Sequence, residues 1–190
     1  MLTGKKIVLG VSGGIAAYKM ANVASMLSKL HADIHVVMTE NATHFITPET
    51  FEVLTGNHCY TDTFDRCMEL HVPHIALGTQ ADAILIAPAS ADVVGKIANG
   101  IADDMLTTCV LPATCPVMLA PSMNVHMYEN PIVQDNMKKL VSYGYEIIEA
   151  DEGYLACRDI GKGKLPPEHV LVDYIIRACA MDKDLAGKKV

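Results

Sequence analysis

The stretch "KKIVLGVSGGIAAYK" (5–19) decides the fold class of this chain. An apolar run stops at the paired glycines Gly13 and Gly14, and a helical pattern follows at once over 15–30. An apolar strand that turns through glycines into a helix is typical of α/β proteins. The segment therefore predicts an α/β fold whose first strand and first helix meet at a glycine turn.

The same alternation continues along the chain. We expect strands over 32–39, 82–90, 115–123 and 145–150, and helices over 48–56, 91–100, 102–112, 130–144 and 166–180. Strands that alternate with helices predict one domain with a doubly wound parallel sheet. Ligands of such sheets bind at the carboxyl ends of the strands, where the strand order switches. The polar motifs of this sequence fall in such strand-end loops.

Composition limits the partners. The chain has 190 residues, of which 51% are hydrophobic and 19% charged, and a net charge of −7. This composition argues against disorder, and it favours extra apolar surface for subunit contacts. The negative charge gives no overall attraction to nucleic acid or to anionic membranes, so an anionic ligand must be held by local groups.

Cysteine usage and the amino terminus indicate a cytoplasmic protein. The initial apolar run is too short for a signal peptide, and no run is long enough to span a membrane. Six cysteines occur without a CxxC pair, so we expect reduced thiols. The segment "DLAGKKV" (184–190) repeats the pattern of "MLTGKKIV" (1–8), which fits either a frayed tail or the first strand of a second domain.

Two strand-end turns are candidates for binding a mononucleotide. Ser12, Gly13 and Gly14 let the backbone approach a ligand and leave helix N–H groups for a phosphate, although a tight turn without ligand has the same pattern. Ser90 and Asp92 open the helix after the next strand, where ordinary capping is the alternative. The two turns together suit a mononucleotide better than either does alone.

Three further segments carry candidate catalytic groups. Asn124 follows a buried strand and could hydrogen-bond a carboxylate, while its methionine neighbours fit a core position equally well. His71 and His74 lie downstream of Cys67, a spacing compatible with a metal site, with structural histidines or with His74 as a general base. Cys157 lies in the glycine-rich, mobile-looking loop "GYLACRDIGKGK" (153–164), which is typical of a reactive thiol.

Together, these motifs resemble the flavin-dependent cysteine decarboxylases, and within them the branch that acts on 4'-phosphopantothenoylcysteine. The resemblance covers nearly all of 4–180 and rests on "GVSGGIAAYK" (10–19), "PHIAL" (73–77), "APASADVVGKIANGIADDMLTT" (87–108), "PSMNVHMYENP" (121–131) and "LACRDIGKG" (155–163). The family pattern P-x-M-N-x-x-M-[W/Y] is met by Pro121, Met123, Asn124, Met127 and Tyr128. One departure is Arg158, where the family usually has glycine.

The resemblance implies a Rossmann-like flavoprotein fold, FMN as cofactor, a small-molecule substrate, and a homotrimer that is often assembled into a dodecamer. It assigns FMN binding to Ser12, Gly13, Gly14, Ile15, Thr39, Phe45, Ala89, Ser90, Ala91, Asp92 and Ser122. It makes His74, Asn124 and Cys157 catalytic, with Cys157 as the proton donor, and it assigns substrate contacts to Asn124, Met127, Ala156 and Arg158. His71 does not match the motif position and stays structural, and no metal is implied.

The implied reaction yields 4'-phosphopantetheine for coenzyme A biosynthesis. Flavin oxidises the substrate's CH2–SH group to a thioaldehyde, and CO2 loss then gives an enethiolate. The alternatives are oxidative decarboxylation of a peptide's carboxyl-terminal cysteine, a non-catalytic flavin-binding regulatory subunit, and a flavodoxin-like electron carrier. We expect residues 1–181 to form the decarboxylase domain, and 182–190 to be a linker and the first strand of a fused phosphopantothenate–cysteine ligase domain.

Overall fold

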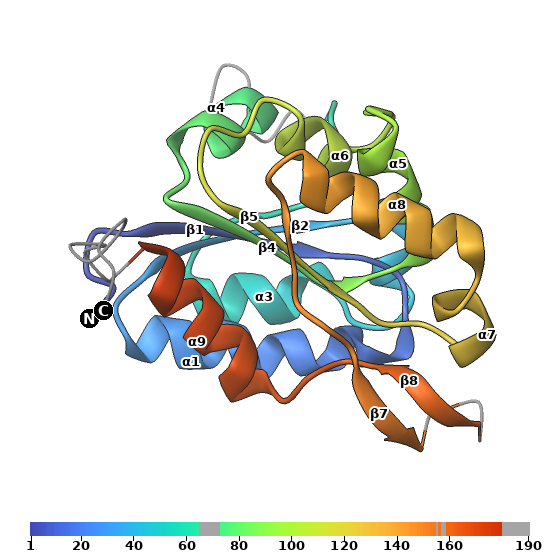
Figure 1. The fold of residues 1–190 in the computed structure, drawn as a ribbon. Coiled ribbons are helices and arrows are strands. Elements are labelled where there is room, and N and C mark those ends of the chain that lie inside the picture. Colours follow the sequence, from blue (N-terminus) through green and yellow to red (C-terminus); the bar gives the residue numbers. More distant parts are fainter. Residues whose placement is uncertain (65–72, 155, 157–158, 180–190) are drawn as a thin grey trace, which may run out of the picture.

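A six-stranded parallel sheet lies between two layers of helices in the computed structural model (Figure 1), which describes residues 1–64, 73–154, 156 and 159–179. The strand order is β3-β2-β1-β4-β5-β6. The strands are β1 (Lys6–Val11), β2 (Asp33–Met38), β3 (Cys59–Tyr60), β4 (Ala83–Ala89), β5 (Val117–Pro121) and β6 (Glu146–Ile147). This arrangement confirms the predicted doubly wound, Rossmann-like sheet.

Helices connect the strands and cover both faces of the sheet. They are η1 (Ile15–Tyr18), α1 (Lys19–Lys29), α2 (Glu40–Thr43), α3 (Pro48–Thr55), α4 (Pro73–Gln80), α5 (Ala91–Ala98), α6 (Met105–Val110), α7 (Val125–Tyr128), α8 (Pro131–Ser142) and α9 (Glu168–Cys179). In Figure 1, α1, α3 and α9 lie on one side of the sheet, whereas α4, α5, α6 and α8 lie on the other.

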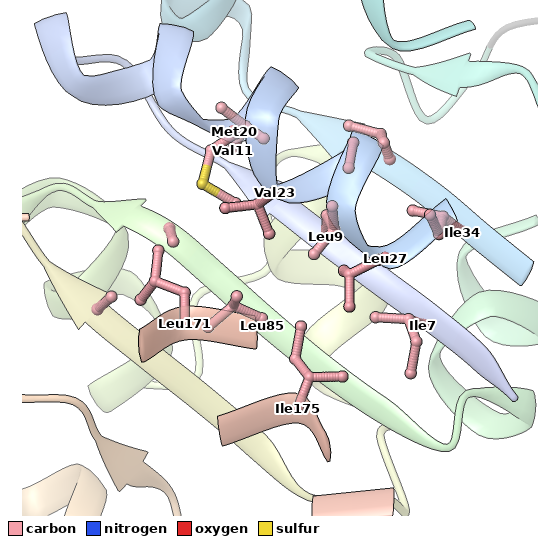
Figure 2. Packing of buried hydrophobic residues seen from close by; sticks show 14 of the residues in the cluster. Ile7, Leu9, Val11, Met20, Val23, Leu27, Ile34, Leu85, Leu171 and Ile175 are labelled. Carbon is pink, nitrogen blue, oxygen red and sulfur yellow. The ribbon is translucent and has the colours of Figure 1, made fainter. Parts of the chain in front are cut away.

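Alternation along the strands divides the core into two clusters. Ile7 and Leu9 of β1 pack with α1 and α9, as Figure 2 shows, whereas Val8 between them packs with the helices of the opposite face. All three side chains are fully buried. Burying an aliphatic side chain of this size contributes roughly 1.5–3 kcal/mol, so the sheet is stabilised from both sides.

The helix expected over 48–56 is present as α3, and it ends at Gly56 in the left-handed conformation. Several short elements were not expected. α2 and α7 have four residues each and β3 has two, which leaves little periodicity to recognise, and the eight-residue α4 was not expected either. In the part of the chain that the structure describes, no helix combines the length and apolarity that a membrane span requires.

The loop expected over 153–164 is replaced at both ends by strands. β7 (Asp151–Tyr154) pairs in antiparallel fashion with β8 (Ile160–Lys164), and the two form a hairpin that projects from the sheet near α7 (Figure 1). The sequence "IGKGK" of β8 has little intrinsic strand propensity, so pairing with β7 decides its conformation. The expectation of a mobile-looking loop was wrong for these flanks, which form strands.

Two helical glycines provide a test of the packing between helices. A Cβ atom at Gly78 of α4 would lie 2.3 Å from the carbonyl oxygen of Cys109 in α6, whereas one at Gly95 of α5 would meet only Asn136, at 3.6 Å. We expect Gly78→Ala to destabilise the fold by about 1–3 kcal/mol, because α4 and α6 must separate. Gly95→Ala is the matched control and should stabilise by about 0.4–1 kcal/mol. Urea unfolding of both variants measures the difference, and equal effects would contradict it.

Candidate functional site

Ser12 joins the two central strands at the point where the strand order switches. Its hydroxyl donates to the carbonyl oxygen of Pro88, at 2.7 Å, and accepts from the amide of Ser90, at 2.8 Å. The Ser12 side chain is fully buried. The structure therefore uses this hydroxyl to hold the ends of β1 and β4 together, and the predicted contact between Ser12 and a cofactor stays a prediction.

A cavity of about 480 Å³ opens beside this junction, within the size range of small-molecule sites. Its walls come from the turns after β1, β4 and β5 and from the β7–β8 hairpin. Nine residues predicted for the site line it: Gly13, Gly14, Ile15, Ser90, Ala91, Ser122, Asn124, Met127 and Ala156. Nine further lining residues were not predicted: Ala16, Tyr18, Lys19, Pro88, Met123, Tyr154, Gly163, Lys164 and Leu165.

The glycine turn presents unused backbone donors to this cavity. A Cβ atom at Gly13 would lie 2.6 Å from Cβ of Asn41, so only glycine fits there. Within the described part of the chain, the amides of Gly13 and Gly14 donate no hydrogen bond. Ser90, on the neighbouring turn, caps α5 by accepting from the amide of Val93. Free amides at a strand–helix turn are suited to an anionic group.

Two lysines add positive charge to the cavity wall, which the sequence analysis missed. Lys19 follows Ile15 by four residues, so both side chains share one helix face, and that spacing was a usable signal. Lys164 ends β8 and reaches the cavity only because the hairpin forms, which the sequence does not reveal. The two lysines are local cations in a chain of net charge −7.

Asn124 is held at both ends of its amide. Its side-chain oxygen accepts from the amide of His126, at 2.9 Å, which caps α7. Its nitrogen donates to the carboxylate of Asp159, at 2.8 Å. The amide is thereby oriented with its oxygen toward α7 and its nitrogen toward the hairpin.

The hairpin itself is attached to the same turn. The amide of Met123 donates to the carbonyl oxygen of Gly163, at 3.0 Å. A Cβ atom at Gly163 would lie 2.3 Å from the Met123 oxygen, and the φ of +144° there also favours glycine. The glycines of "IGKGK" therefore allow β8 to lie directly against the segment that carries Asn124.

Six described residues predicted for the site do not line the cavity: Ser12, Thr39, Phe45, His74, Ala89 and Asp92. Thr39 caps α2 instead. His74 belongs to α4, which lies at the opposite end of the molecule from α7 in Figure 1, and its buried Nδ1 has no hydrogen-bond partner among the described residues.

The predictions for Cys157, Arg158, His71 and Cys67 fall outside the described residues. Within the described ranges, no cluster of metal-binding side chains is found.

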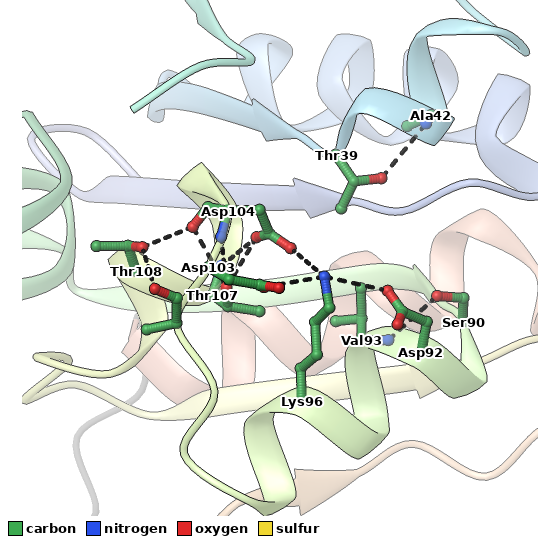
Figure 3. A network of polar contacts seen from close by, with 11 residues as sticks. Thr39, Ala42, Ser90, Asp92, Val93, Lys96, Asp103, Asp104, Thr107 and Thr108 are labelled. Carbon is green, nitrogen blue, oxygen red and sulfur yellow. Dashed lines mark hydrogen bonds and ion pairs between the residues drawn. The ribbon is translucent and has the colours of Figure 1, made fainter. Parts of the chain in front are cut away.

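In α5, which follows the cavity turn at Ser90, Lys96 forms ion pairs with three carboxylates (Figure 3). Its ammonium lies 3.0 Å from both Asp103 and Asp104, and 3.5 Å from Asp92. Burial would lower the pKa of Lys96, but hydrogen bonds to Asp103 and Asp104 outweigh burial and raise it. Asp104 also forms a capping box with Thr107 at the start of α6. The network therefore ties α5 to α6.

Removing the Lys96 charge should weaken the fold in a pH-dependent way. Burial raises the pKa of Asp104, but hydrogen bonds from Thr107 and Lys96 prevail and lower it. A lowered pKa gives stability that is present above the ordinary value and lost as pH falls through the folded value. We expect Lys96→Met to cost about 1–3 kcal/mol near pH 7, and this difference should shrink as pH falls below about 4.

Lys138→Met is the control for that measurement, because the ion pair of Lys138 among the described residues is an exposed one with Asp135. It should cost less than about 0.5 kcal/mol at any pH. Urea unfolding at a series of pH values checks both variants. A loss for Lys96→Met that is small, or equal at pH 7 and pH 3, would contradict the role of the network.

A doubly wound sheet with a ligand cavity at its switch point defines a nucleotide-binding class of α/β protein. The family model "Flavoprotein" matches residues 1–180. The FMN-dependent cysteine decarboxylase SpaF is similar in structure, with a TM-score of 0.82 and 34% identity over 95% of this chain and 100% of that one. The chain therefore belongs to the Flavoprotein family and, within it, to the flavin-dependent cysteine decarboxylases.

Other relatives are similar to this chain over most of its length. A PPC decarboxylase mutant complexed with pantothenoylaminoethenethiol has a TM-score of 0.81 and 29% identity, over 90% of this chain and 96% of that one. The coenzyme A biosynthesis bifunctional protein CoaBC of Bacillus subtilis (strain 168) is 49% identical over 172 residues, which are 90% of this chain and 42% of the relative. That of Haemophilus influenzae is 40% identical over 189 residues, 100% of this chain and 47% of the relative. The chain thus spans less than half the length of these curated relatives.

Proposed function

We propose that this chain decarboxylates 4'-phosphopantothenoylcysteine to 4'-phosphopantetheine with FMN as cofactor, a step of coenzyme A biosynthesis. One observation carries the proposal: a single cavity is lined both by the predicted cofactor turns and by Asn124, the residue predicted to hold the substrate's carboxylate. The likeness to a PPC decarboxylase and to the CoaBC proteins supports the same substrate.

The residues around the cavity fit FMN. The amides of Gly13 and Gly14 and the cations Lys19 and Lys164 suit a phosphate, while the exposed side chains of Ile15 and Met127 offer apolar surface to a ring system. When bound, FMN supplies the oxidant that the substrate needs, because it takes a hydride from the carbon that bears sulfur.

Asn124 would hold the substrate through its amide nitrogen. Its oxygen accepts from His126, and its nitrogen is the only atom of the side chain that can donate to a ligand. A carboxylate is the acceptor that this substrate brings, and holding it fixes the geometry from which CO2 leaves. His74 is assigned to proton transfer at the thiol, and Cys157 to protonation of the enethiolate carbon. Met127 and Ala156 line the same cavity, and Arg158 is kept as a predicted substrate contact.

The proposal predicts the mass of the product. Incubated with 4'-phosphopantothenoylcysteine, the FMN-loaded chain should yield a product lighter by CO2 alone. Cys157→Ser should bind FMN but release a product lighter by CO2 and two hydrogens, because the enethiolate carbon lacks its proton donor. Cys115→Ser removes a half-buried thiol outside the cavity and should behave as wild type. Mass spectrometry of the products distinguishes these results.

The outcomes of this assay also separate the alternatives. Ordinary phosphopantetheine at the wild-type rate from Cys157→Ser would remove Cys157 from the mechanism. An oxidised product from the wild-type chain itself would favour the oxidative decarboxylation of peptides. Bound FMN without any turnover would favour a non-catalytic flavin-binding subunit.

We further propose that the chain forms a homotrimer in which each site is built from residues of two neighbouring copies. His74 does not line the cavity that holds Asn124, and α4 lies at the other end of the molecule in Figure 1. Ile15 and Tyr18, at the cavity, and Phe45 leave about half or more of their surface exposed, which is unusual for large apolar side chains unless a partner covers them. A neighbouring copy could then supply both the cover and the histidine.

Mixing two inactive variants tests this sharing. His74→Asn and Asn124→Ala should each abolish turnover when alone. Oligomers assembled from an equal mixture should recover about a quarter of wild-type activity, because random assortment leaves that share of sites with an intact His74 and an intact Asn124. Activity that stays at zero, with mixed oligomers shown by native mass spectrometry, would place both residues of a site in one copy.

Residues 1–181 are proposed as the decarboxylase domain, and 182–190 as the linker and first strand of a fused phosphopantothenate–cysteine ligase domain. The length of the curated relatives, about twice that of this chain, supports this division. Residues 182–190 lie outside the described part of the structure.

A further inference from the structure

We propose that Asp159 is a stand-in for the substrate's carboxylate: in the empty enzyme it binds the amide of Asn124, and the substrate displaces it. This inference rests on the proposed function, because it takes Asn124 as the group that binds the carboxylate. It adds a residue that sets the balance between binding substrate and binding product.

The first step is the chemistry of the observed pair. The Asn124 nitrogen donates to a carboxylate oxygen of Asp159 at 2.8 Å, across 35 positions of sequence. Hydrogen bonds to an ionised acceptor are shorter and stronger than those between neutral groups. Asp159 therefore offers Asn124 the same functional group that the substrate would bring.

The second step is the count of donors and acceptors on Asn124. The amide oxygen is taken by the amide of His126, which leaves the nitrogen as the part of the side chain able to bind a carboxylate. Two carboxylates at one neutral amide nitrogen would be forced close together and would repel each other. Although the nitrogen carries two N–H groups, this repulsion makes the substrate's carboxylate and that of Asp159 compete at this amide.

The third step is the attachment of the hairpin. β8 remains fixed to the Asn124 turn through the backbone bond between Met123 and Gly163. The close packing of Gly161 against Val125, where a Cβ atom would lie 2.6 Å from Cγ2, acts in the same way. Neither contact involves Asp159. The attachment of β8 to the Asn124 turn therefore does not depend on the bond between Asp159 and Asn124.

This exchange has opposite consequences for substrate and product. A ligand with a carboxylate must compete with Asp159, so the pair weakens substrate binding. 4'-Phosphopantetheine has lost the carboxylate and does not compete, so Asp159 returns to Asn124 once CO2 has left. The half-buried amide nitrogen thereby donates to a carboxylate in both states.

Ligand binding to the FMN-loaded chain tests the exchange. The probes are 4'-phosphopantothenoylserine, which keeps the carboxylate but replaces the oxidisable thiol with a hydroxyl, and 4'-phosphopantetheine, which has no carboxylate. Asp159→Ala should bind the serine analogue about 3- to 10-fold more tightly than wild type, because the competing acceptor is gone. Its affinity for phosphopantetheine should be unchanged. Isothermal titration calorimetry measures both.

Three controls make the result specific. Glu152→Ala removes an exposed carboxylate of β7 and should change neither affinity. Asp159→Asn keeps an acceptor without charge and should fall between wild type and Asp159→Ala. In an Asn124→Ala background, Asp159→Ala should have no effect on the serine analogue, because the shared partner is missing.

Several results would overturn the proposal. The serine analogue could bind Asp159→Ala as weakly as wild type or more weakly, or both ligands could change by the same factor, as for a purely structural residue. If wild type decarboxylates 4'-phosphopantothenoylcysteine and any of these results holds, the stand-in role fails alone. If wild type neither binds the analogue nor turns over the substrate, the proposed function fails and the stand-in role fails with it.

Discussion

The arrangement of the site depends on the hydrogen bonds of one buried hydroxyl group, that of Ser12. Ser12 joins the ends of β1 and β4 by donating to Pro88 and accepting from Ser90. These two strands are neighbours in the sheet, but the connections that follow them run in opposite directions. The chain connectivity therefore does not by itself align the two strand ends. A further link, from the amide of Ser122 to the carbonyl oxygen of Ala89, extends the alignment to β5. Three turns therefore face one cavity.

Charge in this site is local. A chain of net charge −7 would repel an anionic cofactor and an anionic substrate, yet the cavity wall carries free glycine amides and the side chains of Lys19 and Lys164. Nearby, Lys96 partly neutralises three carboxylates that would otherwise oppose an anion at the start of α5. The protein thus stays acidic overall while its crevice suits phosphate and carboxylate groups.

Features that depend on neighbouring residues were predictable from the sequence. The glycine turn, the cap at Ser90 and the polar turn at Asn124 were all expected, because strand ends and helix starts have local signatures. The hairpin and the pair between Asn124 and Asp159 were not, because each depends on segments that meet only after folding. The position of His74, away from the cavity, was not predictable for the same reason. The sequence identifies the residue type and its motif, but its location depends on how α4 packs in the folded chain.

A decarboxylase faces a constraint that most binding sites do not, because the reaction removes the group by which the ligand is held. Once CO2 leaves, a donor arranged for a carboxylate loses that acceptor, and losing a hydrogen bond in a half-buried place costs free energy. Water could fill the gap, but an acceptor fixed to the protein is already in place and needs no ordering. In the exchange proposed above, Asp159 is that acceptor. The glycines of β8 are needed because they let the strand lie close enough to Asn124 for Asp159 to reach its amide. The glycine-rich hairpin would then be the segment that restores the acceptor of Asn124 after each reaction.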